Sequence, residues 1–72
     1  MTDPRRTLMT VAAEDAREGD QIPGLDNAHL WANPERPYAD VPEVLIRFHD
    51  ANGDEGTIEC PADMPLTIAR LL

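Results

Sequence analysis

The chain has 72 residues and a mass of 8.0 kDa, which leaves room for one small domain with a small core. Fourteen acidic residues against six basic ones give a formal charge of −8, so direct binding to nucleic acid or to anionic membranes is disfavoured. Serine and lysine are absent, which excludes a serine nucleophile, a lysine Schiff base and the lysine of a Walker-type phosphate loop.

The first half of the chain predicts short strands separated by turns. Residues 1–6 are polar with an early proline and are expected to form a flexible tail. The apolar, Thr-rich run 7–11 predicts a strand. The polar stretch after it predicts a single helical turn near residues 14–17, because a short helix without an apolar stripe is marginal. The further elements expected here are strands at 20–22 and 28–32, with a turn at 23–27 between them.

The second half carries the clearest alternation of apolar and polar residues. Three prolines within residues 33–42 predict a loop or an edge connection, since proline cannot donate to a β-ladder. Residues 43–49 predict a strand that directs Val44, Ile46 and Phe48 to the core. The last predicted strands are 57–60 and 66–72.

This order of elements predicts an all-β fold, either a barrel or a sandwich, in which residues 7–72 form a single domain. Closing the strands into a barrel would hide edges that invite pairing with other chains. The expected core consists of inward apolar side chains, namely Val11, Ile22, Leu30, Val44, Ile46, Phe48, Ile58, Cys60, Leu66 and Ile68.

The segment HDANGDEGT places Asp50, Asn52 and Asp54 at the spacing of the first ligands in an EF-hand calcium loop. That loop also needs a glycine at its sixth position and a glutamate at its twelfth, where this chain has Glu55 and Pro61. Asn-Gly and Glu-Gly between two alternating runs are typical of a hairpin. The segment is interpreted as a hairpin tip, and no metal ion or other cofactor is expected.

Side chains suited to catalysis or metal binding are few. Cys60 is the single cysteine, so no intramolecular disulfide forms, and with His29 and His49 it completes the nitrogen and sulfur ligand candidates. Alternation places Cys60 inward and His49 outward, which argues against a zinc site and against a Cys–His nucleophile pair. The carboxylates are scattered, and so short a chain seldom forms the deep cleft that a catalytic pair requires. The protein is predicted not to be an enzyme.

Aromatic side chains flank the proline-rich connection. Trp31 and Tyr38 lie there, with His29 and Arg36 nearby. Aromatic residues on loops and edges are enriched in protein interfaces, although a Trp or Tyr also caps the end of many small barrels. We predict a protein-binding surface formed by His29, Trp31, Arg36 and Tyr38, with the capping role as the alternative.

Two segments resemble known sequences. VAAEDAREGDQI (residues 11–22) resembles the V-x-A-x-D-x-x-x-G-D-x-I opening of small SH3-like β-barrels, including Hint-type modules, although Ala16 stands where Leu or Val is usual. CPADMPLTIAR (residues 60–70) is similar to the P-A-D-x-P-[VL]-x-[VI]-x-R ending of short, uncharacterised proteins of actinobacteria and actinobacteriophages. The resemblance implies an SH3-like barrel of about five short strands with one helical turn, and a phage or actinobacterial origin. It implies no activity, because the Hint nucleophile is missing.

These observations predict a small, non-enzymatic binding or accessory protein, phage-encoded, that engages a host or phage protein. One alternative is an acidic DNA-mimic inhibitor of a nucleic-acid-binding protein, suggested by the net charge and weakened by the interleaved arginines. Another is a minor structural or assembly protein of the virion that associates through an edge strand. The expected state is a monomer or a small homo-oligomer.

The expected location is the cytoplasm, or the host cytoplasm for a phage protein. The chain shows no basic-then-apolar signal at its start and no apolar run approaching the ~18 residues that span a bilayer. Protein partners are expected, and neither nucleic acid nor membrane is expected as a direct partner.

Overall fold

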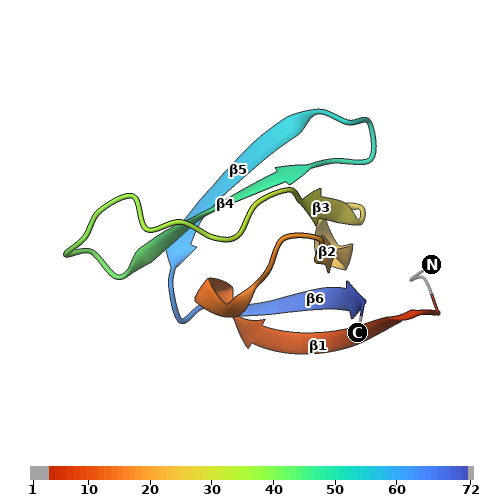
Figure 1. Ribbon diagram of the computed structural model, residues 1–72, viewed down its shortest axis with the longest axis horizontal. Coiled ribbons are helices and arrows are strands. Elements are labelled where there is room, and N and C mark those ends of the chain that lie inside the picture. Colours follow the sequence, from red (N-terminus) through yellow and green to blue (C-terminus); the bar gives the residue numbers. More distant parts are fainter. Residues whose placement is uncertain (1–3, 72) are drawn as a thin grey trace.

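The computed structural model describes residues 4–71 and is built almost entirely of strands (Figure 1). The predicted all-β class is confirmed, with six strands where about five were predicted and two short 3-10 turns where one helical turn was predicted. Residues 1–3 of the predicted tail 1–6 and Leu72, the last residue of the final predicted strand, lie outside the described residues. Arg6 was predicted to belong to the tail and is instead the first residue of a strand. The strands are β1 (Arg6–Ala12), β2 (Gln21–Ile22), β3 (Ala28–Leu30), β4 (Glu43–His49), β5 (Glu55–Pro61) and β6 (Pro65–Leu71), and the 3-10 turns are η1 (Ala13–Asp15) and η2 (Pro23–Leu25).

All six strands belong to one antiparallel sheet in the order β1-β6-β2-β3-β4-β5. The long pairs β1–β6 and β4–β5 form its two halves, and the short strands β2 and β3 connect them, with Gln21 opposite Ala69 of β6. Figure 1 shows β1 and β6 at the bottom of the view and β4 and β5 at the top. The sheet therefore curls around its core and leaves β1 and β5 as its two edges.

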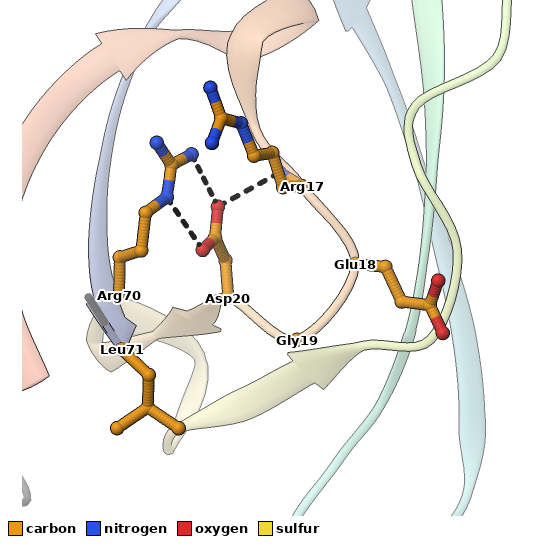
Figure 2. Close-up of a pocket in the computed structure, with 6 residues that line it drawn as sticks. All are labelled: Arg17, Glu18, Gly19, Asp20, Arg70 and Leu71. Carbon is orange, nitrogen blue, oxygen red and sulfur yellow. Dashed lines mark hydrogen bonds and ion pairs between the residues drawn. The ribbon is translucent and has the colours of Figure 1, made fainter.

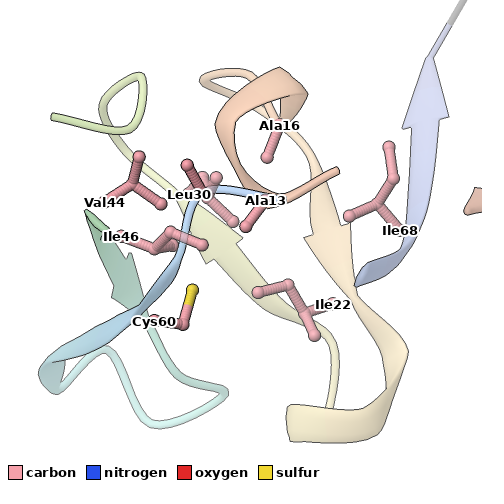
Figure 3. Close-up of a cluster of buried hydrophobic side chains, with 9 residues drawn as sticks. Ala13, Ala16, Ile22, Leu30, Val44, Ile46, Cys60 and Ile68 are labelled. Carbon is pink, nitrogen blue, oxygen red and sulfur yellow. The ribbon is translucent and has the colours of Figure 1, made fainter. Parts of the chain in front are cut away.

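The core lies between these halves and draws on almost every element (Figure 3). Six of the ten predicted core residues are buried there, and three more pack half-buried against the cluster. The buried predicted residues are Ile22, Leu30, Val44, Ile46, Cys60 and Ile68, and the half-buried ones are Val11, Ile58 and Leu66.

Residues 4–71 contain no helix with the length and apolar character that a membrane crossing requires.

Alanines fill core positions that the apolar pattern did not mark. Ala13, Ala16 and Ala62 are 0%, 3% and 5% exposed. The N–H of Ala13 donates to the carbonyl of Met64 at 2.9 Å, which holds η1 against the connection between β5 and β6. Backbones this close leave room for a methyl group and little more, which suits an alanine at position 13.

Phe48 differs from the prediction, because it is only half-buried. Its register partner is Gly56, and a Cβ atom on residue 56 would lie 2.6 Å from the Cζ atom of Phe48. The ring therefore lies over the glycine. Gly56 was interpreted as a turn residue, and it is instead a strand position inside β5 that makes room for this ring.

The predicted hairpin between β4 and β5 is confirmed. One carboxylate oxygen of Asp50 accepts the N–H groups of Asn52 and Asp54, each at 2.9 Å. Gly53 has a φ of +83°, which a side chain would disfavour. The carboxylate of Asp50 thus shapes the turn by bonding to the backbone, as expected of an aspartate at this position.

Candidate protein-binding surface

The outer face of β3 and β4 carries two of the four predicted site residues. His29 of β3 pairs in register with His49 of β4, and the N–H of Trp31 donates to the carbonyl of Arg47 at 3.3 Å. Because side chains alternate along a strand, His29, Trp31, Arg47 and His49 share one face. Ile46 points to the opposite face and is completely buried. We call these four residues the Trp31 surface.

Trp31 is the centre of this surface. Its ring stacks on the imidazole of His49, with ring centroids 5.8 Å apart and an interplanar angle of 20°. The guanidinium carbon of Arg47 lies 5.8 Å from the Trp31 ring centroid, within the range of a cation–π contact. Trp31 still exposes 39% of its surface. It lies on the outer face of the sheet, and its ring is held by the contacts with His49 and Arg47.

Polar contacts extend the surface at both ends. The Nε2 atom of Gln21 lies 2.7 Å from the Nε2 atom of His29. The Nε atom of Arg47 lies 3.4 Å from a carboxylate oxygen of Glu35. Two backbone hydrogen bonds between Glu35 and Leu45, at 3.0 and 2.7 Å, fasten the start of the proline-rich loop to β4. This part of the loop is therefore a fixed border of the Trp31 surface.

The other two predicted residues lie elsewhere. Arg36 donates from Nη2 to a carboxylate oxygen of Glu14 at 3.0 Å, so it connects the loop to η1. Tyr38 is 56% exposed in the loop, and within residues 4–71 no ring contact joins it to Trp31. The structure therefore brings His29 and Trp31 together. Their neighbours on this face are Arg47 and His49, and not the predicted Arg36 and Tyr38. The sequence pattern directed Arg47 and His49 outward, but it did not reveal that β3 is their neighbour.

A second polar cluster joins the two segments that carry the resemblance (Figure 2). Arg70 donates from Nε to one carboxylate oxygen of Asp20 at 3.0 Å and from Nη2 to the other at 2.9 Å. The N–H of Arg17 adds a third bond to that carboxylate at 2.8 Å. Asp20 is 2% exposed, and its hydrogen bond is the main reason that the pKa of Arg70 is raised.

This ion pair borders a shallow surface pocket of about 240 Å³, which Figure 2 shows with its lining residues. Nη2 of Arg70 also donates to the backbone carbonyl of Asp15 at 3.1 Å. Within residues 4–71, every buried side-chain nitrogen or oxygen has a hydrogen-bond partner. The polar groups of Asp20 are therefore already satisfied, and the pair fastens the residue before β2 to β6.

The remaining titratable groups with a shifted pKa lie on the β4–β5 pair. Burial raises the pKa of the Cys60 thiol, and the charge of Glu43 raises it further, so little nucleophilic thiolate forms. The pKa of Glu43 is raised first by a hydrogen bond from its carboxyl to Glu59, then by burial and by the charge of Glu59. This carboxyl pair lies outside the pocket beside Asp20. In the described part of the chain, no three His, Cys, Asp or Glu side chains gather closely enough to hold a metal ion.

Comparison with known proteins found no match to the chain among protein families, curated proteins or solved structures. The resemblance to SH3-like barrels of actinobacteria and actinobacteriophages therefore stays a prediction that depends on the two quoted segments.

Proposed function

We propose that the protein is a non-enzymatic binding module that engages a protein partner through the Trp31 surface. The observation that carries the proposal is the exposed Trp31 ring, held in place by His49 and Arg47. Tryptophan and arginine are the residue types most enriched among interface hot spots. A ring that is already fixed loses little conformational entropy on binding, so more of its contact energy contributes to affinity.

The charge of the surface indicates the chemistry of the partner. Both histidines and Arg47 gather on this face of a protein whose net charge is −8. Glu35 neutralises part of the Arg47 charge. A partner segment with an apolar or aromatic side chain to cover Trp31, and with hydrogen-bond acceptors beside it for the imidazoles, fits this arrangement.

The setting follows from the resemblance. An accessory protein encoded by a phage and acting in the host cytoplasm on a host or phage protein is the role that agrees with it. The raised pKa of the Cys60 thiol agrees with a role without catalysis.

The DNA-mimic alternative is less well supported. A mimic of phosphates needs a face of one sign. Within residues 4–71, arginines bond to carboxylates in three different parts of the molecule, two of them at the surface, which interrupts such a face. These pairs are Arg36–Glu14, Arg47–Glu35 and Arg70–Asp20.

The proposal is tested by capture from an actinobacterial lysate with three tagged baits. The wild-type chain and Leu25→Ala should recover the same protein, and Trp31→Ala should lose it. Leu25 is a matched control because it is 38% exposed, close to the 39% of Trp31, and lies in η2 outside the Trp31 surface.

Titration of the purified partner then measures how much affinity Trp31→Ala loses. A hot-spot tryptophan contributes about 2 kcal/mol or more, so Trp31→Ala should weaken the Kd by about 30-fold or more. Equal capture by Trp31→Ala and the wild type would contradict the proposal. His49→Ala should show a smaller loss, since it removes the support of the ring and leaves the ring itself.

A further inference from the structure

We propose that the protein self-associates through β1, whose free edge pairs antiparallel with β1 of a second copy and joins the two sheets. β1 has a sheet neighbour on one side only, which is β6. Its seven residues, RTLMTVA, contain no proline and no acidic residue. Figure 1 shows this strand (red-orange) along one margin of the molecule, with no element beyond it. Such an edge presents unpaired N–H and C=O groups to solvent.

The other edge of the sheet is protected. β5 reads EGTIECP, with Glu55 and Glu59 exposed on it and Pro61 at its end. Charged side chains and proline are the usual means by which an edge strand is prevented from pairing with another chain. The contrast between the two edges identifies β1 as the strand available for pairing.

Charge explains why the occupant is a second copy of this acidic chain. All fourteen acidic residues lie outside β1 and β6, so this is the part of the surface where two molecules of charge −8 can approach closely. β1 begins with Arg6, whose charged guanidinium donates to the carbonyls of Gly19 and Ala69, each at 3.0 Å. Glu14, which pairs with Arg36, and Asp15 follow the strand in η1. Antiparallel pairing centred near Met9 sets the basic start of each copy beside the acidic η1 of the other. Parallel pairing would set like charges together.

The side chains of β1 and β6 fit the same arrangement. Leu8 and Leu71 are 57% and 53% exposed and share the outer face of this strand pair. Thr10 lies on that face as well, with its hydroxyl 3.4 Å from the hydroxyl of Thr67. Pairing near Met9 would extend this neutral row across both copies, with Leu8 of one beside Thr10 of the other. Pairing of one edge buries a modest area, so the dimer is expected to be reversible.

The test is the molar mass in solution, measured by sedimentation equilibrium from micromolar to millimolar concentration. The wild type should shift from 8.0 kDa toward twice that mass as the concentration rises. Thr10→Lys places a charge on the pairing edge and should abolish the shift. Thr57→Lys is the matched control, because Thr57 is an exposed threonine on the other edge strand, and it should leave the shift intact.

Hydrogen exchange locates the contact independently of the variants. In the wild type, amides of β1 should gain protection with concentration, while those of β5 should not. Circular dichroism confirms that both lysine variants remain folded. A wild type that stays monomeric at millimolar concentration would overturn the proposal, as would a dimer that Thr10→Lys leaves intact or that Thr57→Lys disrupts.

Discussion

Asp20 shows at the scale of one residue how this small fold tolerates a buried charge. Its carboxylate has lost almost all contact with water, and only Arg70 and the N–H of Arg17 compensate for the lost hydration. Removing one partner of a buried pair leaves the other charge uncompensated, which typically costs about 3–5 kcal/mol. Asp20→Asn should therefore lower the free energy of unfolding by an amount in that range, measured by urea denaturation.

A neighbouring carboxylate supplies the control for Asp20. Glu18 lines the same pocket but is exposed, so Glu18→Gln should leave the urea midpoint close to that of the wild type. An Asp20→Asn protein as stable as Glu18→Gln would show that the ion pair does not stabilise the fold.

Glu43 gives a prediction for pH. Its pKa is raised in the folded protein, first through the hydrogen bond to Glu59. A group whose folded pKa lies above its unfolded pKa stabilises the fold below the unfolded value, and this contribution is lost as the pH rises through the folded pKa. Glu43→Gln keeps a hydrogen-bond donor at every pH, so it should raise the melting temperature at neutral pH and have little effect in acid.

The matched variant for Glu43 is Glu55→Gln. Glu55 is exposed on the β4–β5 pair, and its register partner is His49. Its removal should bring no gain at neutral pH. Equal melting temperatures for Glu43→Gln and the wild type both in acid and at neutral pH would refute the interpretation of the carboxyl pair.

At the scale of the element, the β4–β5 hairpin depends on the fit between Phe48 and Gly56. A side chain on residue 56 would displace the ring that lies over it. Forcing extra atoms into such a contact typically costs about 1–3 kcal/mol, so Gly56→Val should destabilise the protein by that amount. In the Phe48→Ala background the same substitution should cost much less. Additive losses in denaturant titrations of the two single variants and the double variant would contradict the contact.

The elements were predictable to the extent that their sequences alternate. Val44 and Ile46 mark β4 so clearly that its bounds agree with the prediction, whereas β2 and β3 are too short to show a period. The buried alanines were missed because alanine occurs as readily on a surface as in a core. The insertion of β6 between β1 and β2 is a pairing between distant segments, and no local pattern encodes it.

The candidate site was predictable in part for the same reason. His29 and Trp31 were found because aromatic residues beside a proline-rich loop are conspicuous. Arg47 and His49 join them only through the pairing of β3 with β4, which is a property of the folded sheet. Arg36 does not belong to the Trp31 surface, because the path of the loop brings its side chain to Glu14.

For the whole molecule, the two proposed contacts lie on different parts of the sheet. β1 is one edge strand, and the Trp31 surface belongs to β3 and β4, which lie beyond β6 and β2 in the strand order. Pairing through β1 would therefore leave both Trp31 surfaces of a dimer accessible. Such a dimer would bind an immobilised partner at two points, which would raise the apparent affinity without any new contact.

The stability of the whole molecule depends on one core. Alanine substitutions of Ile46 and Phe48, which both lie in β4, test this. Ile46 is completely buried, with 0% of its surface exposed, whereas Phe48 is half-buried near the hairpin tip. Replacing a buried isoleucine with alanine costs about 2–5 kcal/mol. A domain of this size has a stability of roughly 0.05–0.15 kcal/mol per residue, so Ile46→Ala should unfold a large share of the molecules. Phe48→Ala should remain folded with a lower melting temperature. Thermal melts followed by circular dichroism measure both variants. Equal losses of stability in the two would mean that the core extends to the hairpin tip.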